Sequence, residues 1–195
     1  DGKRVFVVGH SLGAMAAPAI AERDPSIAGV VLMAALARPF EDGILEQQEW
    51  LVSEDGVVDE KDLDGVLAVR ARNRQIKAHT LPDDQLVKMG LSVKYFDGVN
   101  ALDPVGKAKK LGRPVLVLQG GRDFQVSPLH DFTVFKEALV DVKGAQCKLY
   151  PLATHLFIDG TGRASMAEYE KTAHVNQAVV DDISAFVNAS PTQKS

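Results

Sequence analysis

The hydrophobic positions of the chain gather in four short blocks. Three of these blocks, at 5–8, 28–34 and 114–119, are apolar at nearly every consecutive position, a pattern typical of strands buried on both faces inside a parallel sheet. The fourth block, 146–150, alternates polar and apolar residues. We therefore expect it to be an edge strand with one wetter face.

Segments of helical periodicity separate the four predicted strands. Helices are expected at 14–23, 127–140 and 173–188. Strands that alternate with helices imply right-handed parallel crossovers. The sequence therefore predicts an α/β layered fold, a parallel sheet with flanking helices, in a single domain over residues 1–195.

A longer helical insertion interrupts this alternation at 38–99. Apolar residues recur on a helical period over 41–54 and 59–79, and the proline and aspartates of 81–84 predict the start of another short helix. The insertion is typical of a cap over a site. A crossover helix grown long for packing explains the pattern equally well.

The first strand raises the question of a missing partner. A strand buried on both faces needs a neighbour at each edge, yet only Asp1-Gly2-Lys3-Arg4, with no initiator methionine, precedes it. We expect the N-terminal strands of the fold to lie outside this chain. An upstream segment or a second chain would then complete the sheet.

Composition narrows the function classes. The 195 residues carry a net charge of −4 and are 46% hydrophobic, so no electrostatic feature favours nucleic acid or an anionic membrane as a partner. The apolar runs are too short for a membrane span. Cys147 is the only cysteine, which excludes an internal disulfide and a thiolate metal cluster. No spacing of His, Cys, Asp or Glu predicts a metal, and no glycine loop predicts a nucleotide cofactor.

The richest chemical motif follows the first strand. Gly9-His10-Ser11-Leu12-Gly13 links that strand to an alanine-rich helix, the context of a nucleophile elbow. Ser11 is expected at a strained turn with positive φ, and Gly9 and Gly13 where a Cβ would collide between strand and helix. The Leu12 N–H, at the helix N-terminus, is the expected oxyanion donor. An ordinary glycine-rich turn with an N-capping serine is the alternative.

Two further strand ends carry the partners that a nucleophilic serine needs. Asp123 follows the third predicted strand and His155 follows the fourth. Serine, acid and histidine in this chain order are typical of an α/β-hydrolase triad. His155 would accept the Ser11 proton and later deliver it to the leaving group, while Asp123 would fix the imidazole tautomer.

Other residues compete for these roles. Asp103 is an alternative acid, although Asp103-Pro104 is also a helix-start signal. Asp159 is a weaker alternative acid in a glycine-flanked loop. His10 is expected to be a structural or pocket-wall residue, and helical contexts predict surface positions for His79, His130 and His174. Candidate substrate-binding residues are His10, Phe40, Phe124 and Leu156, with Phe157 beside them, although core packing is the simpler role for each aromatic or aliphatic residue.

Three motifs together resemble a known family. The stretches G-H-S-L-G, L-V-L-Q-G-G-R-D and L-Y-P-L-A-T-H-L-F closely resemble the C-terminal half of bacterial α/β-hydrolase-fold esterases, relatives of the dienelactone-hydrolase and prolyl-oligopeptidase-like group. The resemblance implies a carboxylesterase that forms an acyl-enzyme on Ser11, with residues around 38–99 as the cap. It also weakly favours export, to the periplasm or outside the cell.

The resemblance leaves alternatives open. It implies that the family's first strands, and the loop that gives the second oxyanion donor, are absent from this chain. Loss of one such donor typically lowers turnover about 100- to 1,000-fold. A peptidase or thioesterase with the same triad is one alternative function. A non-catalytic half-domain that binds a partner through its open sheet edge is another.

Overall fold

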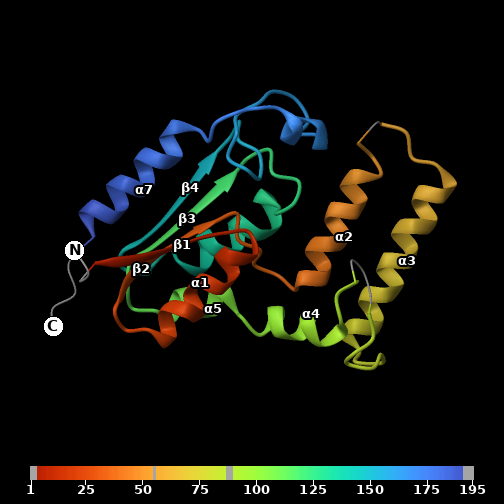
Figure 1. The fold of residues 1–195 in the computed structure, drawn as a ribbon, viewed down its shortest axis with the longest axis horizontal. Helices are drawn as coiled ribbons and strands as arrows, with labels where there is room; N and C mark the ends of the chain where they lie inside the picture. The colour runs from red at the N-terminus through yellow and green to blue at the C-terminus, as the bar shows by residue number, and fades with distance from the viewer. Residues whose placement is uncertain (1–3, 55, 87–89, 191–195) are drawn as a thin grey trace. The chain divides into compact units, whose positions relative to one another are not determined.

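The computed structural model describes residues 4–54, 56–86 and 90–190. These residues form two compact units (Figure 1). The first unit comprises Asp1–Ala37 and Asp103–Ser195, and the second comprises Arg38–Leu102. The chain therefore leaves the first unit after the second strand and returns to it before the third.

The first unit is built on a four-stranded parallel sheet. Its strands, in the spatial order β1-β2-β3-β4, are β1 (Val5–His10), β2 (Ile27–Met33), β3 (Val115–Gly120) and β4 (Ala145–Tyr150). The register pairs His10 with Met33, Met33 with Leu118, and Gly120 with Tyr150. The carboxyl ends of the strands thus lie along one edge. This is the predicted α/β-hydrolase type of sheet.

Helices cover both faces of this sheet. Helices α1 (Leu12–Arg23), α5 (Pro104–Lys110) and α6 (Thr133–Ala138) share one hydrophobic cluster with β2 and β3. Helix α7 (Gln177–Ala189) lies on the opposite face (Figure 1). There the Phe186 ring packs edge-on against Phe6 of β1, with 6.0 Å between centroids.

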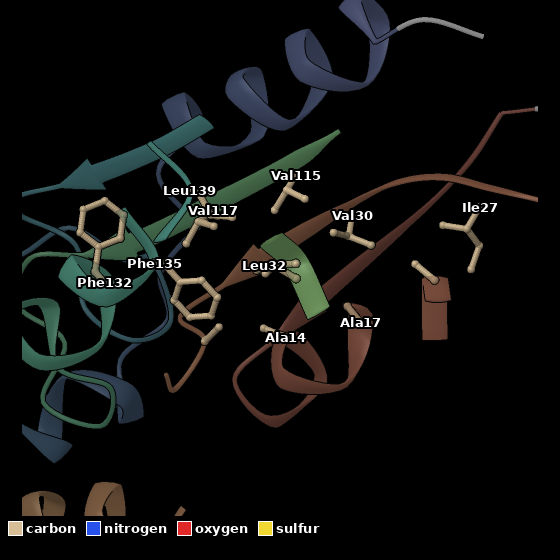
Figure 2. Packing of buried hydrophobic residues seen from close by; sticks show 13 residues of the cluster. Ala14, Ala17, Ile27, Val30, Leu32, Val115, Val117, Phe132, Phe135 and Leu139 are labelled. Atoms are coloured by element: carbon tan, nitrogen blue, oxygen red, sulfur yellow. The ribbon is translucent and has the colours of Figure 1, made fainter. Parts of the chain in front are cut away.

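The main core lies between the sheet and the first three of these helices (Figure 2). Side chains alternate between the faces of a strand, and Val30, Leu32, Val115 and Val117 point into this cluster, against Ala14 and Phe135 among others. The small alanines of α1 let the helix approach the sheet closely. The apolar residues between these strand positions are buried as well, so β2 and β3 are buried on both faces as predicted.

The prediction that β1 is buried on both faces is wrong for the described residues. Val5 is 44% exposed and Val8 is 51% exposed. The reason is topological, because β1 lies at an edge of the sheet and pairs with β2 alone within the described part of the chain. At the other edge, β4 has the predicted mixed burial pattern.

Several helix boundaries differ from those predicted. The segment predicted as one helix over 127–140 is a π-helical turn, Pro128–Phe132, followed by α6. Helix α7 begins at Gln177, with the Asn176 side chain capping it. A short 3₁₀ helix, Met166–Glu170, lies between β4 and α7, where no helix was predicted.

The second unit contains three helices among its described residues. They are α2 (Phe40–Leu51), α3 (Glu60–Lys77) and α4 (Val93–Asn100). Ile44, Ile76 and Phe96, one from each helix, form its core. The short helix predicted to start at 81–84 is wrong, because these residues form a turn in which the Gln85 N–H donates to the Pro82 carbonyl. In the described ranges of the whole chain, no helix is long and apolar enough to cross a membrane.

Candidate active site

Ser11 lies at the junction of β1 and α1. Strand β1 ends at His10 and helix α1 begins at Leu12, which leaves Ser11 alone in the turn. Its φ is 56° and its ψ is −121°, a conformation that non-glycine residues rarely adopt and that occurs mostly at functional sites. The Ser11 N–H donates to the Met33 carbonyl at 2.9 Å. The strained turn is therefore fixed to the neighbouring strand.

The two motif glycines differ in what they do. A Cβ on Gly9 would lie 2.3 Å from the Gly13 carbonyl oxygen and 2.7 Å from the Ala14 nitrogen. Both atoms belong to the backbone and cannot move aside cheaply, so Gly9 permits the close crossing of strand and helix. The same expectation for Gly13 is wrong, because a Cβ there would meet no heavy atom within 4 Å. Gly13 lies on the exposed side of the helix.

Helix α1 leaves its N-terminus open next to Ser11. The N–H groups of Ala14 and Met15 both donate to the Ser11 carbonyl. Leu12 is the first helical residue, where an N–H has no intrahelical acceptor, and its side chain is exposed. The position of Leu12 is thus compatible with the oxyanion role predicted for its N–H.

The structure brings His155 and Asp123 together. His155 Nδ1 lies 2.8 Å from Asp123 Oδ2, and both side chains are buried. Asp123 follows β3 and His155 follows β4, so both lie beyond the carboxyl edge of the sheet. Gly120 allows this approach, because a Cβ there would lie 2.4 Å from the Thr154 carbonyl oxygen.

Hydrogen bonds fix the Asp123 carboxylate on each oxygen. Its Oδ1 accepts from the main-chain N–H groups of Gln125, at 2.8 Å, and Val126, at 2.9 Å. Its Oδ2 accepts from the Gln119 Nε2 at 2.9 Å as well as from His155. The carboxylate is thereby held in a fixed orientation.

Gln119 is the residue of this site that the sequence predictions missed. It is 1% exposed, and its Nε2 also lies 3.1 Å from the Val126 carbonyl and 3.3 Å from that of Gly120. All three neighbours are acceptors, which identifies the facing atom as the amide nitrogen. The sequence did contain a signal, because Gln119 is a single amide at the end of the apolar β3 segment. A buried polar group needs a hydrogen-bond partner, so such an amide indicates a specific contact.

His10, the last residue of β1, contacts the loop that carries His155. Its Nε2 lies 2.8 Å from the His155 main-chain oxygen, and the two imidazole rings are 4.6 Å apart. A carbonyl oxygen only accepts, so Nε2 of His10 is the donor. Partial burial lowers the pKa of His10, and the hydrogen bond to His155 opposes this shift.

The 3₁₀ helix that follows His155 contacts the turn after β3 through an ion pair and an aromatic stack. Arg122 forms a bidentate ion pair with Glu168, with N–O distances of 2.7 and 3.0 Å. This pair lowers the pKa of Glu168. Tyr169 stacks on Phe124, with 5.8 Å between ring centroids, and burial raises the pKa of its phenol. The 3₁₀ helix therefore closes over the Asp123 turn.

The alternative candidates for the acid and the base bind other residues or lie exposed on the surface. Asp103 caps α5 by accepting from the Gly106 N–H at 3.1 Å, and Asp159 accepts from the Asn176 side chain at 2.7 Å. His79 is exposed, 3.9 Å from Asp97 in the second unit. His130 is exposed in the π-helical turn, and His174 is exposed before α7.

The predicted substrate-binding residues lie in different surroundings. Phe40 is the first residue of α2 and packs against Phe96 in the second unit, and its contact with substrate stays a prediction. Phe124 is buried under Tyr169. Leu156, next to His155, is 37% exposed. Phe157 is buried and packs edge-on against His10.

The described part of the chain has no cluster of metal-ligating side chains, and its one cysteine is partly buried. It contains no group of three or more His, Cys, Asp or Glu side chains that could hold a metal ion. Cys147 is partly buried on β4, and this burial raises the pKa of its thiol. A thiol with a raised pKa is a weak nucleophile at neutral pH.

Comparison with known proteins identifies the family. The family described as "Serine aminopeptidase, S33" matches residues 1–161, which include Ser11, Asp123 and His155. The chain belongs to the serine aminopeptidase S33 family. Membership in this family of α/β-hydrolases agrees with the parallel sheet and with the strand-turn-helix at Ser11.

Individual relatives of this S33 chain include esterases. It is 34% identical over 187 residues to esterase EstD of Thermotoga maritima, a match that covers 96% of this chain and 43% of that protein. The chain thus spans less than half the length of this curated relative.

Solved structures with the same fold include a monoacylglycerol lipase of Paleococcus ferrophilus, with a TM-score of 0.51, 21% identity, and 95% of this chain and 70% of that chain covered. An esterase of Pyrococcus furiosus gives a TM-score of 0.50 at 12% identity, with 95% and 53% covered. At such identities the structures show the shared fold alone.

Proposed function

We propose that this chain carries the catalytic residues of a serine hydrolase that cleaves carboxylic esters. Ser11 is the nucleophile, His155 the general base and Asp123 the orienting acid. The observation that carries the proposal is the buried 2.8 Å contact between His155 Nδ1 and Asp123 Oδ2, at the same sheet edge as the strained Ser11 turn. A strained backbone turn and a buried polar pair each cost free energy, so their presence together favours a functional role.

The proposed reaction begins with proton transfer. With Nδ1 of His155 donating to Asp123, the neutral imidazole presents an unprotonated Nε2. This nitrogen takes the proton of Ser11 as Oγ attacks the ester carbonyl carbon, and then gives it to the departing alcohol. Water, deprotonated by the same nitrogen, hydrolyses the acyl-enzyme. The acid leaves and Ser11 regains its proton.

Charge stabilisation accompanies each proton transfer. The Asp123 carboxylate, which keeps donors on both oxygens, stabilises the imidazolium that forms on His155. The Leu12 N–H, at the start of α1, is the proposed donor to the oxyanion. Leu156 and His10, adjacent in sequence to the base and the nucleophile, are the proposed contacts to substrate.

An ester is the favoured substrate because the relative with 34% sequence identity is named an esterase. The family description favours a second candidate, the removal of N-terminal residues from peptides. The same triad serves both reactions, and pocket shape decides between them. Thioester cleavage is a third use of the triad.

Finer assignments remain predictions. They are the dienelactone-hydrolase and prolyl-oligopeptidase-like subgroup, the C-terminal half of the fold, and the role of residues 38–99 as a cap. Completion of the sheet at β1 by an upstream segment or a second chain is also a prediction, as is export. The exposed edge of β1 is compatible with an added strand.

Hydrolysis of p-nitrophenyl acetate and butyrate tests the catalytic proposal. We expect the wild-type chain to hydrolyse both esters and Ser11→Ala to fall to the background rate, a loss of at least about a thousandfold. Ser26→Ala, in an exposed turn, is the matched serine control. Equal rates for wild type and Ser11→Ala would refute the assignment.

Covalent labelling separates a catalytic role from a binding role. A fluorophosphonate should modify Ser11, as mapped by mass spectrometry, and the label should be lost in His155→Ala. A label on another serine would contradict the triad while leaving a hydrolase. No label and no hydrolysis would favour the non-catalytic half-domain. Amino-acid p-nitroanilides and acyl thioesters, assayed beside the esters, then rank the three reactions by kcat/KM.

A further inference from the structure

The second unit contains a cavity of its own. It has a volume of about 250 Å³ and opens between helices α2, α3 and α4. Ile44 of α2, Ile76 of α3 and Phe96 of α4 form its buried floor. Ala68, Val69 and Leu86 form its rim. Asn73 also lines the cavity, with its Nδ2 donating to the Glu41 carbonyl at 2.6 Å. Apart from Asn73 and Arg72, the lining residues are apolar.

One cation lines this apolar cavity. Arg72 of α3 is partly buried at its edge. The residues within reach of Arg72 along the helix, at positions three and four away, are Ala68, Val69, Gln75 and Ile76. None of them is acidic. Among the residues that the structure describes, the Arg72 guanidinium has no hydrogen bond or ion pair.

Two other cations of α3 pair with acidic residues of α2. Arg70 pairs with Glu49, and Lys77 pairs with Asp42, with Nζ 2.6 Å from Oδ1. Arg72 is the cation of this helix that is partly buried against apolar residues without an anion. A guanidinium in such surroundings favours a carboxylate, which it binds through two parallel hydrogen bonds.

The size of the cavity limits the ligand. A dry apolar cavity of about 150 Å³ accommodates benzene, which has six heavy atoms. By the same ratio the cavity of about 250 Å³ accommodates about ten heavy atoms. A saturated carboxylate of about eight carbons has this size, with an apolar tail for the floor and an anionic head for Arg72.

We propose that the second unit binds a medium-chain monocarboxylate, with the carboxylate on Arg72 and the alkyl tail on Ile44, Ile76 and Phe96. The site lies entirely within residues 38–102. Its lining residues all belong to the second unit, and the proposal stands or falls on binding alone. The loss of ester hydrolysis in Ser11→Ala and the loss of ligand binding at Arg72 are independent results.

Calorimetric titration of the full chain with octanoate tests the site. We expect one ligand per chain and an affinity that rises about fourfold for each methylene from butyrate to octanoate. The gain should stop near the length that fills the cavity. Arg72→Gln should weaken octanoate at least about tenfold, because it removes a charge-assisted contact. Arg74→Gln, which removes an exposed arginine of the same helix, should leave binding unchanged.

Two further measurements test whether binding requires the cavity and the charge of Arg72. Ala68→Phe should fill the rim and abolish binding, while circular dichroism and the unfolding midpoint confirm that the variant is folded. The uncharged analogue 1-octanol should bind wild type and Arg72→Gln equally, because it does not need the guanidinium. No binding of octanoate to wild type, or equal weakening by Arg72→Gln and Arg74→Gln, would overturn the proposal.

Discussion

His10 and His155 are joined through the main chain. The Nε2 of His10 donates to the carbonyl oxygen of His155 at 2.8 Å. His10 immediately precedes the proposed nucleophile, and His155 is the proposed base, so this bond couples the two halves of the proposed triad. It links the end of β1 to the loop after β4, the two outer strands of the sheet.

The first prediction concerns this bond. His10→Ala should lower kcat/KM for p-nitrophenyl butyrate about tenfold, because a hydrogen bond that positions His155 is lost. His10→Gln, which keeps a donor of similar reach, should retain more activity than His10→Ala. Activities of both variants equal to that of wild type would show that the bond does not position the base. Fluorophosphonate labelling rates should follow the same order.

The second prediction concerns Gln119. Gln119→Leu keeps the buried volume but removes a donor from Asp123 Oδ2, and should reduce kcat/KM about 10- to 100-fold. Gln119→Glu places a second carboxyl group beside Asp123, and two such groups cannot easily both ionise. Its activity relative to that of wild type should therefore fall as the pH rises and the second carboxyl group ionises. Gln146→Leu, at an exposed position of β4, is the control. A Gln119→Leu variant with full activity would contradict the positioning role.

Much of the fold was predictable because the signals were local. Consecutive apolar residues at β2 and β3 reflect burial on two faces, and the Asp103-Pro104 signal does cap a helix, α5. The same apolar pattern at β1 did not predict the exposure of Val5 and Val8. Burial of a strand depends on the neighbours that it has, and the residues of one strand do not specify them.

The residues of the candidate site divide in the same way, into those that the strand order places and those that tertiary contacts place. Ser11, Asp123 and His155 each follow a strand, so the topology of a parallel sheet places them at one edge. Gln119 could not be assigned a role, because its partner is four residues away across a turn whose shape is set by tertiary contacts. The surroundings of Phe40 could not be predicted for a related reason. An aromatic residue that follows a strand can contact the site or the core of an inserted unit, and Phe40 packs against the core of the second unit.

The third prediction compares the two motif glycines. Gly9→Ala forces a Cβ against the Gly13 carbonyl, and should destabilise the chain by about 1–3 kcal/mol or more. Gly13→Ala has open space within helix α1. It should stabilise the chain by up to about 1 kcal/mol, because alanine is the better helix former. Urea unfolding of the two variants measures the difference, and equal effects would show that the crossing at Gly9 is not tight.

The last prediction concerns pH and the Arg122–Glu168 ion pair. The guanidinium holds the pKa of Glu168 below its ordinary value of 4.5. A lowered native pKa means that the unfolded chain takes up its proton first as the pH falls. The contribution of the pair is therefore complete above about pH 5 and is lost as the pH drops through the native pKa.

Glu168→Gln should cost about 1–2 kcal/mol of unfolding free energy at pH 7, because it leaves the nearly buried Arg122 without its anion. The difference from wild type should shrink below pH 4.5. Glu170→Gln, an exposed neighbour, should change little at either pH. Because the 3₁₀ helix that carries Glu168 closes over the Asp123 turn, Glu168→Gln should also speed hydrogen exchange in the loop around His155. A pH-independent difference between Glu168→Gln and wild type would mean that the carboxylate charge does not hold this segment.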